Sequence, residues 1–439
     1  MWKRFLLAMT VMVLGLMSGC TMRPVDQMYC LPKRPAAYNN LQAVMDEAMA
    51  GKEYCAPLTG ENLQTVQMVD LDGDGEREYL LFAKSESQKV LQILVFRHED
   101  GKYALSDTVE CNGSAFDQVE YAQMDGRGGM ELVIGCKLSD QLPRSVCVYT
   151  CVDAEIKQVA TANYTKFLTC DLNDDMLTEL MVFRSGQSNG DKGIAELYSM
   201  ASGSMVRFND VSMSGSADSL KHIAVGMLGS GAQAVFADCA VEGQGIVTDV
   251  YTVVDGVFTN LPFSAETATS HRTLREKVIY VEDVDGDGEI ELPALMDMKL
   301  PDTGELTGDC ALIRWYTLDK GGSETDKLYT YHDFAGGWYM ELGDEWADRI
   351  CVVQDGDTYG FYLWNRMLSQ PQRIFTVYAF SGQNREELAL MENRFILQRE
   401  KNTVYAAHLE VASGNMNLSR EALIQGFHKI RQEWKTGIL

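Results

Sequence analysis

A short acidic loop recurs at nearly regular intervals along this chain of 439 residues. Its two complete copies read DLDGDGERE from Asp70 and DVDGDGEIE from Asp283, and a third copy, DLNDDMLTE, begins at Asp171. Degenerate copies, which keep only part of the motif, begin at Gln123 and Gly226, so that successive starts lie 53, 48, 55 and 57 residues apart. Self-similarity at a period of this length is typical of arrays built from one repeated supersecondary unit.

Each loop lies between two short runs rich in β-branched, aromatic and aliphatic residues, which predicts a strand on either side. A further apolar run, 25 to 33 residues after each loop start, ends in an aromatic residue. These aromatic positions are Phe96, Tyr149, Tyr198, Tyr251 and Tyr316, and Tyr378 is a sixth that no such loop precedes. A unit with roughly four strands cannot bury its own apolar face, so its neighbours must cover it.

We therefore expect an all-β fold, a β-propeller of about six to seven four-stranded blades. An open β-solenoid and a string of small sandwiches are the alternatives. Apolar residues at helical spacing predict a short N-terminal helix that packs on the array, formed around Leu41, Val44, Met45 and Met49. The same spacing predicts a closing helix over residues 419–435, with Ser419 as its N-cap and a stripe of Leu423, Phe427, Ile430 and Trp434.

The two complete loops have the chemistry of a calcium site. Calcium takes six to eight oxygen ligands, and loop positions 1, 3 and 5 can direct side-chain oxygens to one point while glycines at positions 4 and 6 allow the turn. Position 7 would give its backbone carbonyl, and an acid at position 9 would complete the site. The candidate ligands are Asp70, Asp72, Asp74, Glu76 and Glu78 in the first loop, and Asp283, Asp285, Asp287, Glu289 and Glu291 in the fifth.

The other loops fit this pattern less well. The third loop offers Asp171, Asn173, Asp175 and Glu179 as ligands but lacks both glycines. In the second loop Arg127 stands where a ligand should be, so we expect no metal there. An EF-hand is excluded because position 12 is Leu81 in the first loop and Ala294 in the fifth, and strands are predicted to follow.

The N-terminus has the form of an export signal. Lys3 and Arg4 precede an apolar run over residues 5–17, which is too short for a comfortable membrane span. The following Ser18-Gly19-Cys20 resembles the end of a bacterial lipobox. We expect cleavage after residue 19 and lipidation of Cys20, which would anchor the protein to the extracytoplasmic face of the cell membrane.

The DxDGDGxxE loop between strands, recurring at about 50 residues, resembles FG-GAP/VCBS repeats, which occur in integrin-like β-propellers and in bacterial surface proteins. With the lipobox, the chain is similar to FG-GAP/VCBS lipoproteins of Gram-positive bacteria. The resemblance covers about residues 60–300 and fades from 320 to 439. It implies calcium in the blade loops and an extracytoplasmic location, and it does not imply one activity.

The net charge argues against one class of partner, and the cysteine spacing bears on metal sites and disulfides. Without residues 1–19 the chain keeps 36 of its 38 Lys and Arg against 63 Asp and Glu, a net charge of −27, which argues against a nucleic-acid partner. The ten cysteines after Cys20 show no zinc-type spacing. Most are interpreted as small buried strand residues, although Cys136 and Cys147 flank one short turn and could face each other.

A GxSxG match at residues 186–190 lies between two predicted strands, whereas a nucleophile elbow needs a strand-to-helix turn. We therefore expect a binding or structural module for a protein or glycan ligand, and no enzyme. The alternative is a carbohydrate-active lyase or hydrolase on the same scaffold. The expected division is a signal peptide (1–19), a lipid-anchored linker (20–37), the repeat array (38–318), and divergent blades with the closing helix (319–439).

Overall fold

The computed structural model describes residues 36–139, 143–186, 192–298, 310–344, 347–363, 371–410 and 418–430. The described residues form six antiparallel sheets and little helix. Residues 1–35, with the predicted signal peptide, Cys20 and nearly all of the linker, lie outside this part of the chain. Within the described residues, no helix has the length and apolar character needed to cross a membrane.

The second, third and fourth sheets are simple meanders with short connections, and the first is a meander whose edge carries one further short strand. The first comprises β1 (Lys52–Tyr54), β2 (Val66–Val69), β3 (Glu78–Ser85), β4 (Leu91–Glu99) and β5 (Lys102–Cys111). The second comprises β6 (Ala115–Ala122), β7 (Glu131–Lys137), β8 (Arg144–Val152) and β9 (Glu155–Tyr164). The third comprises β10 (Lys166–Cys170), β11 (Glu179–Arg184), β12 (Ile194–Ala201) and β13 (Ser204–Ser212). The fourth comprises β14 (Leu220–Met227), β15 (Gln233–Val241), β16 (Gly245–Val254) and β17 (Val257–Asn260).

The last two sheets each have five strands. The fifth comprises β18 (Leu292–Met296), β19 (Cys310–Leu318), β20 (Glu324–Asp333), β21 (Trp338–Leu342) and β27 (Phe427–Lys429). The sixth comprises β22 (Ile350–Asp355), β23 (Thr358–Leu363), β24 (Gln372–Ser381), β26 (Thr403–Leu409) and β25 (Phe395–Arg399). The domain boundary expected after residue 318 therefore falls between the paired strands β19 and β20, inside one sheet.

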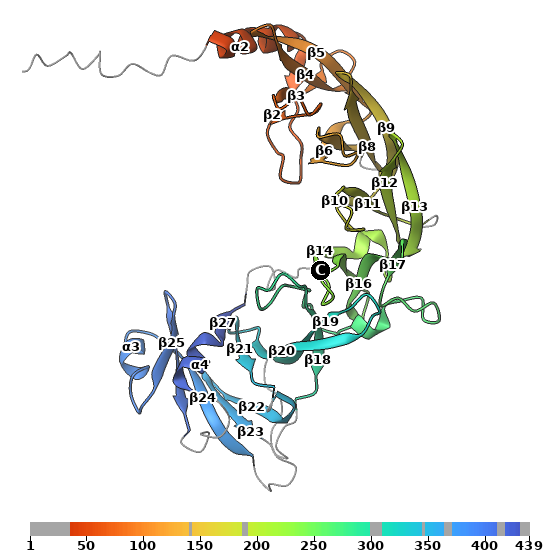
Figure 1. The fold of residues 1–439 in the computed structure, drawn as a ribbon. Helices are drawn as coiled ribbons and strands as arrows, with labels where there is room; N and C mark the ends of the chain where they lie inside the picture. The colour runs from red at the N-terminus through yellow and green to blue at the C-terminus, as the bar shows by residue number, and fades with distance from the viewer. Residues whose placement is uncertain are drawn as a thin grey trace, which may run out of the picture.

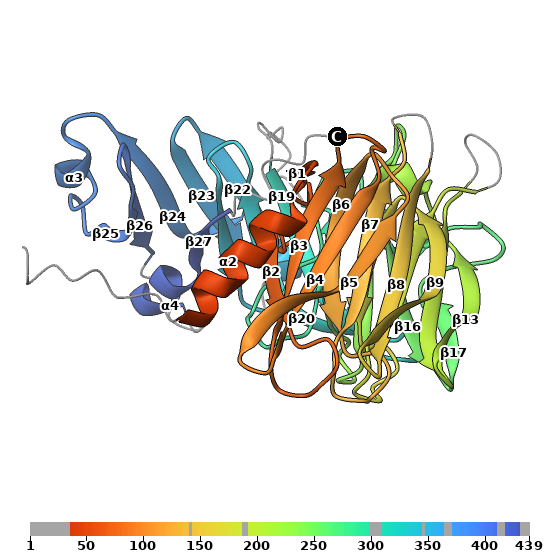
Figure 2. The ribbon, with the colours of Figure 1, turned by 90° about the horizontal axis from the view of Figure 1, so that it is seen from above.

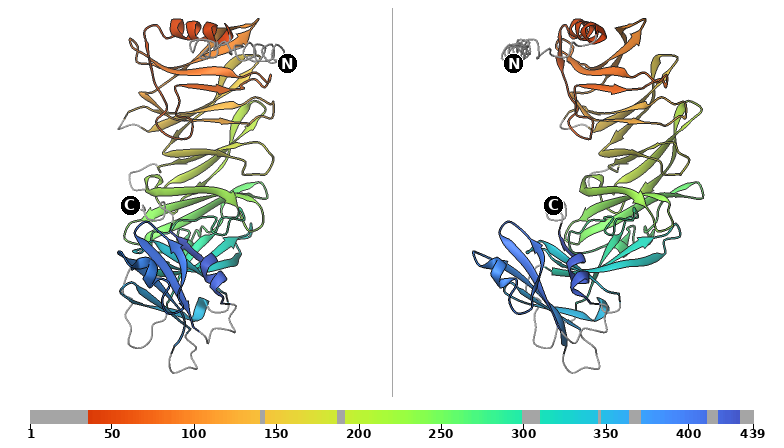
Figure 3. Two further views of the ribbon diagram at one scale, coloured as in Figure 1. Left: turned by 90° about the vertical axis from the view of Figure 1, so that its left-hand side faces the viewer. Right: turned by 60° about the vertical axis from the view of Figure 1, so that its left-hand side comes forward.

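The sheets follow one another in chain order along a curved arc (Figure 1). In the first four sheets the first meander strands (β2, β6, β10, β14) lie on the inner side of the arc and the last strands (β5, β9, β13, β17) on the outer side. The stack runs from the first sheet at one end to the sixth at the other (Figure 3). Six sheets of about four strands agree with the unit that the sequence predicts.

Aromatic and aliphatic side chains fill the spaces between neighbouring sheets. Phe82 of the first sheet meets Phe116 of the second edge to face, with ring centroids 5.1 Å apart. Tyr331 of the fifth sheet meets Phe361 of the sixth in the same way at 5.3 Å. Because side chains alternate between the two faces of a strand, each sheet contributes to two such layers.

The array is open, and both of its outer faces are covered. Helix α2 (Ala36–Ala48) buries Leu41 and Met45 against Leu81 and Phe96, on the face of the first sheet that points away from the second (Figure 2). At the other end, the segment of α3 (Arg385–Leu388) buries Ala389 against β26 of the sixth sheet. A closed propeller is therefore not what the structure shows, since the faces that would meet in a ring are already occupied. Caps of this kind are what an open repeat array needs.

The N-terminal helix is confirmed, and the C-terminal helix is much shorter than predicted. Ser419 is the N-cap, and its side chain accepts a hydrogen bond from Ala422 N, but α4 spans only Arg420–Gln425. The chain then forms β27, which adds to the edge of β21. Phe427 is buried there against Trp338. Trp434 lies outside the described residues. The apolar residues at helical spacing are therefore divided between a helix and a strand, because the helix ends at Gly426.

Candidate metal centres in the acidic loops

The four nine-residue loops share one hydrogen bond that does not depend on metal. In each, the glutamate at position 9 accepts a bond from the backbone nitrogen of position 2. The pairs are Glu78 with Leu71 at 2.7 Å, and Glu131 with Met124, Glu179 with Leu172 and Glu291 with Val284, all at 2.8 Å. The residue at position 2 is buried in the first three of these loops. This glutamate therefore fixes the loop to the strand that follows it, whether or not it also binds a cation.

The aspartate at position 1 organises the turn. Asp70 accepts hydrogen bonds from Gly73 N at 2.7 Å and Gly75 N at 3.0 Å, and both glycines have positive φ angles of 77° and 88°. Asp283 makes the same pair of bonds in the fifth loop. The third loop adopts this conformation with Asp174 and Met176 at positive φ, which is a strained choice for residues with a side chain.

Two loops bring three acids together. Carboxylate oxygens of Asp70, Asp72 and Glu78 all lie within 4.8 Å of one another, as do those of Asp283, Asp285 and Glu291. These two acidic clusters could each hold a metal ion. They are the first and fifth loops, the ones with the complete sequence motif.

The acids at positions 5 and 7 do not join these clusters. In the fifth loop Lys327 lies between Asp287 and Glu289, with its Nζ 2.6 Å and 2.7 Å from their carboxylate oxygens. In the first loop Glu76 points to His98, 3.2 Å away, and Asp74 accepts a bond from the backbone nitrogen of Glu76. Three of the four candidate side-chain ligands in each loop therefore lie together. The backbone carbonyl expected from position 7 is not tested by the direction of the Glu76 and Glu289 side chains.

The fifth loop shows the strongest fit to a cation. Glu291 is fully buried, and its Oε1 has no hydrogen-bond partner among the described residues. Burial, together with the neighbouring Asp285, Asp287 and Asp283, raises the pKa of Glu291 to about 7 against the opposing effect of the hydrogen bond from Val284. A buried oxygen without a partner is costly. Hard divalent cations prefer carboxylate ligands of this kind.

A buried arginine from the neighbouring strand β4 reaches the acids of the first loop, and it was not predicted from the sequence. Arg97 on β4 is buried, and its Nε lies 3.5 Å from Asp72 Oδ2 and 3.8 Å from Glu78 Oε1. Arg97 follows the recurring aromatic Phe96, and Thr150, which follows Tyr149, donates to Glu131 Oε1 at 3.1 Å. The residue after the aromatic therefore faces the position-9 glutamate. That register was present in the sequence and could have identified Arg97.

The third loop uses an amide where the first and fifth have acids. Asn173 Nδ2 donates to Glu179 Oε1 at 2.8 Å and to Asp175 Oδ2 at 3.1 Å. Burial raises the pKa of Glu179 to about 7. The predicted ligands Asp171, Asn173, Asp175 and Glu179 thus lie in one loop, tied by internal hydrogen bonds.

The two degenerate copies differ from the complete loops in charge and in length. In the second loop Arg127 Nε lies 3.4 Å from Asp125 Oδ2, so a cationic side chain faces one of the two acids that remain. The fourth copy aligns from Met227, one residue later than the sequence placed it, because the buried Leu228 takes the place of Leu71. It is also a shorter turn, since β14 ends at Met227 and β15 begins at Gln233.

The loops are stacked by main-chain hydrogen bonds. In each contact a position-8 nitrogen donates to the position-1 carbonyl of the preceding loop. The pairs are Met130 N to Asp70 O at 3.0 Å, Thr178 N to Gln123 O at 2.8 Å, and Ile290 N to Met227 O at 3.0 Å. At Gly129 the packing is so close that an added Cβ would lie 2.3 Å from Leu71 O. The second loop therefore supports its neighbours even though its own acids are mostly lost.

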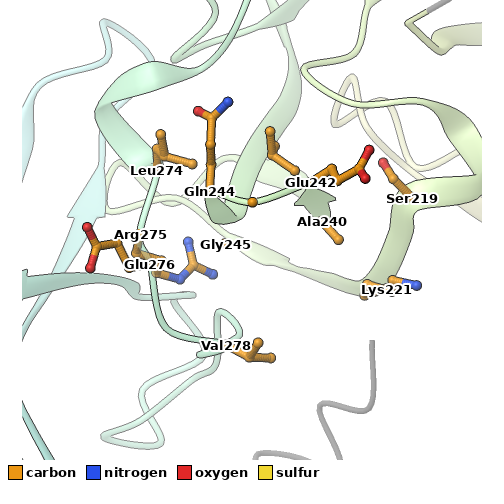
Figure 4. A pocket seen from close by; sticks show the side chains of 12 residues that line it. Ser219, Lys221, Ala240, Glu242, Gln244, Gly245, Leu274, Arg275, Glu276 and Val278 are labelled. Atoms are coloured by element: carbon orange, nitrogen blue, oxygen red, sulfur yellow. The ribbon is translucent and has the colours of Figure 1, made fainter. Parts of the chain in front are cut away.

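A separate pocket of about 990 Å³ opens beside the fourth sheet, between the β15–β16 turn and residues 274–278 (Figure 4). Lys221, Glu242 and Glu276 are among the charged residues that line it. Arg275 also lines it, but its Nη2 donates to the fully buried Asp238 at 2.9 Å. The Arg275 guanidinium and His222 hold the pKa of Asp238 below its usual value despite the opposing effect of burial.

The GxSxG segment is described only in part. Residues 187–191 lie outside the described residues, but the two elements that flank them are β11 and β12, a pair of antiparallel strands. The strand-to-strand context that the sequence predicted is therefore confirmed.

Comparison with known proteins gives no family. No protein-family model matches the chain, and no curated protein matches it. Among solved structures, a rhamnogalacturonan lyase of Bacillus licheniformis is 13% identical over 65% of this chain and 65% of its own, with a TM-score of 0.32. The rhamnogalacturonan lyase YesW is 13% identical over 73% of this chain and 60% of its own, with a TM-score of 0.32. A protein from Lactobacillus plantarum is 10% identical over 72% and 85%, with a TM-score of 0.28. Likenesses this weak carry no argument about activity.

Proposed function

We propose that this chain is a cell-surface lipoprotein whose FG-GAP/VCBS-type repeats form a calcium-stabilised, propeller-like array that binds a protein or glycan ligand or acts as a structural module. The observation that carries the calcium proposal is Glu291, whose buried Oε1 has no hydrogen-bond partner in the described part of the chain and lies in the cluster with Asp283 and Asp285. A divalent cation would satisfy that oxygen and replace repulsion between three carboxylates with ligation. The array would then serve as a scaffold and not as an enzyme.

The two complete loops should not be equivalent. Among the described residues, no arginine enters the fifth-loop cluster, and the Lys327 ion pairs are with the outer acids Asp287 and Glu289. At the first loop Arg97 already balances part of the charge of Asp72 and Glu78. We therefore propose that calcium occupies the fifth loop first and that the first loop binds it more weakly.

Calcium titration of the purified chain tests the proposal. Isothermal titration and thermal unfolding would be compared in calcium, in magnesium and in chelator. Binding should raise the melting temperature by a few degrees, because a ligand at about ten times its dissociation constant contributes roughly 1.4 kcal/mol per site. Asp285→Asn should abolish the stronger site. Asp125→Asn, in the loop where Arg127 occupies a ligand position, is the matched control. Identical melting curves in calcium and chelator would refute the proposal.

The anchor is tested separately. Cys20→Ala should release the protein from the membrane fraction or block its processing, because the lipid would be attached to that thiol. Cys30→Ala, ten residues later, should leave fractionation unchanged. Unaltered mass and membrane retention in Cys20→Ala would refute the lipoprotein proposal without affecting the calcium proposal.

A glycan-binding experiment can distinguish a binding module from a carbohydrate-active enzyme. The pocket beside the fourth sheet carries two glutamates, Glu242 and Glu276, and the basic Lys221, so it is the first place to examine. A glycan array on the intact chain should give retention without product. Formation of new reducing ends or unsaturated products, lost in Glu242→Gln or Glu276→Gln, would favour the lyase or hydrolase instead.

A further inference from the structure

The cysteines are not paired as the hairpin between β7 and β8 suggested. In the strand register Cys136 lies opposite Ser145, and Cys147 lies opposite Ile134, so the two thiols are offset along the hairpin. The partner of Cys136 comes from the neighbouring sheet. Its thiol is in hydrogen-bond contact with the thiol of Cys111, the last residue of β5.

The main chain holds these two cysteines in place. Just after Cys111 the chain passes over β7 at Gly113, where an added Cβ would lie 3.1 Å from Cys136 Cβ. Ser114 N then donates to Lys137 O at 2.8 Å, next to Cys136. Both cysteines are nearly inaccessible and belong to the core layer between the first and second sheets.

We propose that Cys111 and Cys136 form a disulfide that joins the first sheet to the second. Sheets in this array contact their neighbours through side-chain packing and loop hydrogen bonds, so this bond would be a covalent tie across one sheet-to-sheet interface. The bond would span the interface between the sheets that carry the first and second acidic loops. It goes beyond the calcium proposal and does not depend on it.

The chemistry is an ordinary thiol–disulfide exchange with a disulfide oxidant, such as oxidised glutathione or an exported thiol oxidoreductase. The Cys111 thiolate attacks the oxidant, forms a mixed disulfide and releases one thiol. The Cys136 thiolate then attacks Cys111 Sγ and releases the second thiol. The protein loses two protons and two electrons, and the oxidant disulfide becomes two thiols. The hydrogen bond from Cys136 lowers the pKa of the Cys111 thiol, which favours Cys111 as the first nucleophile.

Because both side chains are buried, we expect the bond to form while the chain folds. The test therefore uses the full-length chain in two preparations, one alkylated at cell lysis and one refolded with oxidised glutathione. Trypsin places Cys111 in peptide 103–127 and Cys136 in peptide 128–137, with no other cysteine in either. Mass spectrometry without reduction should find these two peptides linked.

Two other outcomes would overturn the proposal. Peptide 128–137 linked instead to peptide 145–157 would show that Cys136 pairs within the hairpin. Both cysteines recovered in alkylated form from both preparations would show that no bond forms.

Thermal unfolding gives an independent measurement. The bond would close a loop with 24 residues between its two cysteines, and a loop of that size constrains the unfolded chain appreciably. Dithiothreitol should lower the melting temperature of the oxidised protein by a few degrees. Cys111→Ala should remove that dependence on reductant. Cys170→Ala, which alters a buried cysteine of a different core layer, should keep it. A reductant effect that persists in Cys111→Ala would contradict the proposal. Calcium binding can fail with this result intact, so the two proposals are distinguishable.

Discussion

Arg97 lies with its Nε 3.5 Å from Asp72 Oδ2, inside the loop that carries one of the two complete acidic motifs. Its other nitrogens donate to Ala154 O at 2.7 Å and to Cys151 Sγ at 3.0 Å, so the second sheet holds the guanidinium in position. A fixed internal cation and an added calcium ion would compete for the same carboxylates. The first loop therefore has the complete sequence motif, but we expect Arg97 to weaken its binding of calcium.

Replacing Arg97 should strengthen calcium binding at the first loop. In an Asp285→Asn background, which silences the fifth loop, Arg97→Gln should raise the calcium affinity about tenfold or more, equivalent to roughly 1.4 kcal/mol. Without calcium the same variant should be less stable by about 1–3 kcal/mol, because the acidic groups lose a buried hydrogen-bonding and charged partner. Isothermal titration and chelator-treated unfolding measure the two effects. A fall in calcium affinity would show that Arg97 supports the metal-binding conformation.

The pH dependence of the fifth loop has a definite sign. The pKa of Glu291 is about 7 in the folded, metal-free chain against its ordinary 4.5, so the folded state keeps a proton that the unfolded state releases. Stability without calcium should therefore be greatest near and below pH 4.5 as regards this group, fall as the pH rises to about 7, and then level off. Unfolding in chelator across pH 5–8 measures it, and Glu291→Gln should flatten this component.

Calcium binding should have the opposite dependence on pH. The ion needs the ionised carboxylate of Glu291, so binding must displace its proton below pH 7. The affinity of the fifth loop should fall about tenfold between pH 8 and pH 6, as expected for one proton displaced at a pKa near 7. Titration in Asp72→Asn, which disables the first loop, isolates this site. Equal affinity at both pH values would mean that Glu291 is not a ligand.

Close stacking of the loops predicts an unusually sensitive glycine. Gly129→Ala would place a Cβ 2.3 Å from Leu71 O and 3.0 Å from Asp72 C, so the second loop must move away from the first. We expect a loss of about 3 kcal/mol or more, at or above the upper end for overpacking. Gly128→Ala is the matched control, because that position is open and should cost only about 1–2 kcal/mol for its positive φ. Similar melting temperatures for the two variants would contradict the stacking.

The sequence predicted the repeated unit well because its signals are local. The strand–loop–strand pattern, the aromatic of the third strand and Leu41 and Met45 of α2 each depend on residues close together in the chain. Whether six units close into a ring depends instead on what covers the outer faces of the first and last sheets. Phe427 shows the same limit, since helical spacing could not reveal that the edge of β21 was available to pair with it.

The candidate site was predictable in type but not in detail. The acids of the two complete loops were identified from spacing alone, and the carboxylates of positions 1, 3 and 9 lie together in each loop. The role of Lys327 could not be inferred from spacing, because it reaches the fifth loop from a strand later in the chain. Arg97 was overlooked, although its place directly after Phe96 was a usable signal. Cys111 was likewise missed as the neighbour of Cys136, because the contact crosses from one sheet to the next.

Helix α2 should be required to keep the array from associating. Met45 and Leu41 cover Leu81 and Phe96 on the outer face of the first sheet, and an uncovered apolar face of a repeat array invites a second copy to pack on it. Met45→Asp places a charge in that contact and should lower the melting temperature. It should also promote concentration-dependent association, which light scattering during size-exclusion chromatography would detect. Ala43→Asp, on the exposed side of the same helix, is the control and should remain like the unaltered chain.

Because β26 of the sixth sheet is covered separately by the α3 segment, association should proceed through the first sheet and produce dimers before larger assemblies. If Met45→Asp is destabilised but stays monomeric at all concentrations, α2 stabilises the first sheet without serving as a barrier to association.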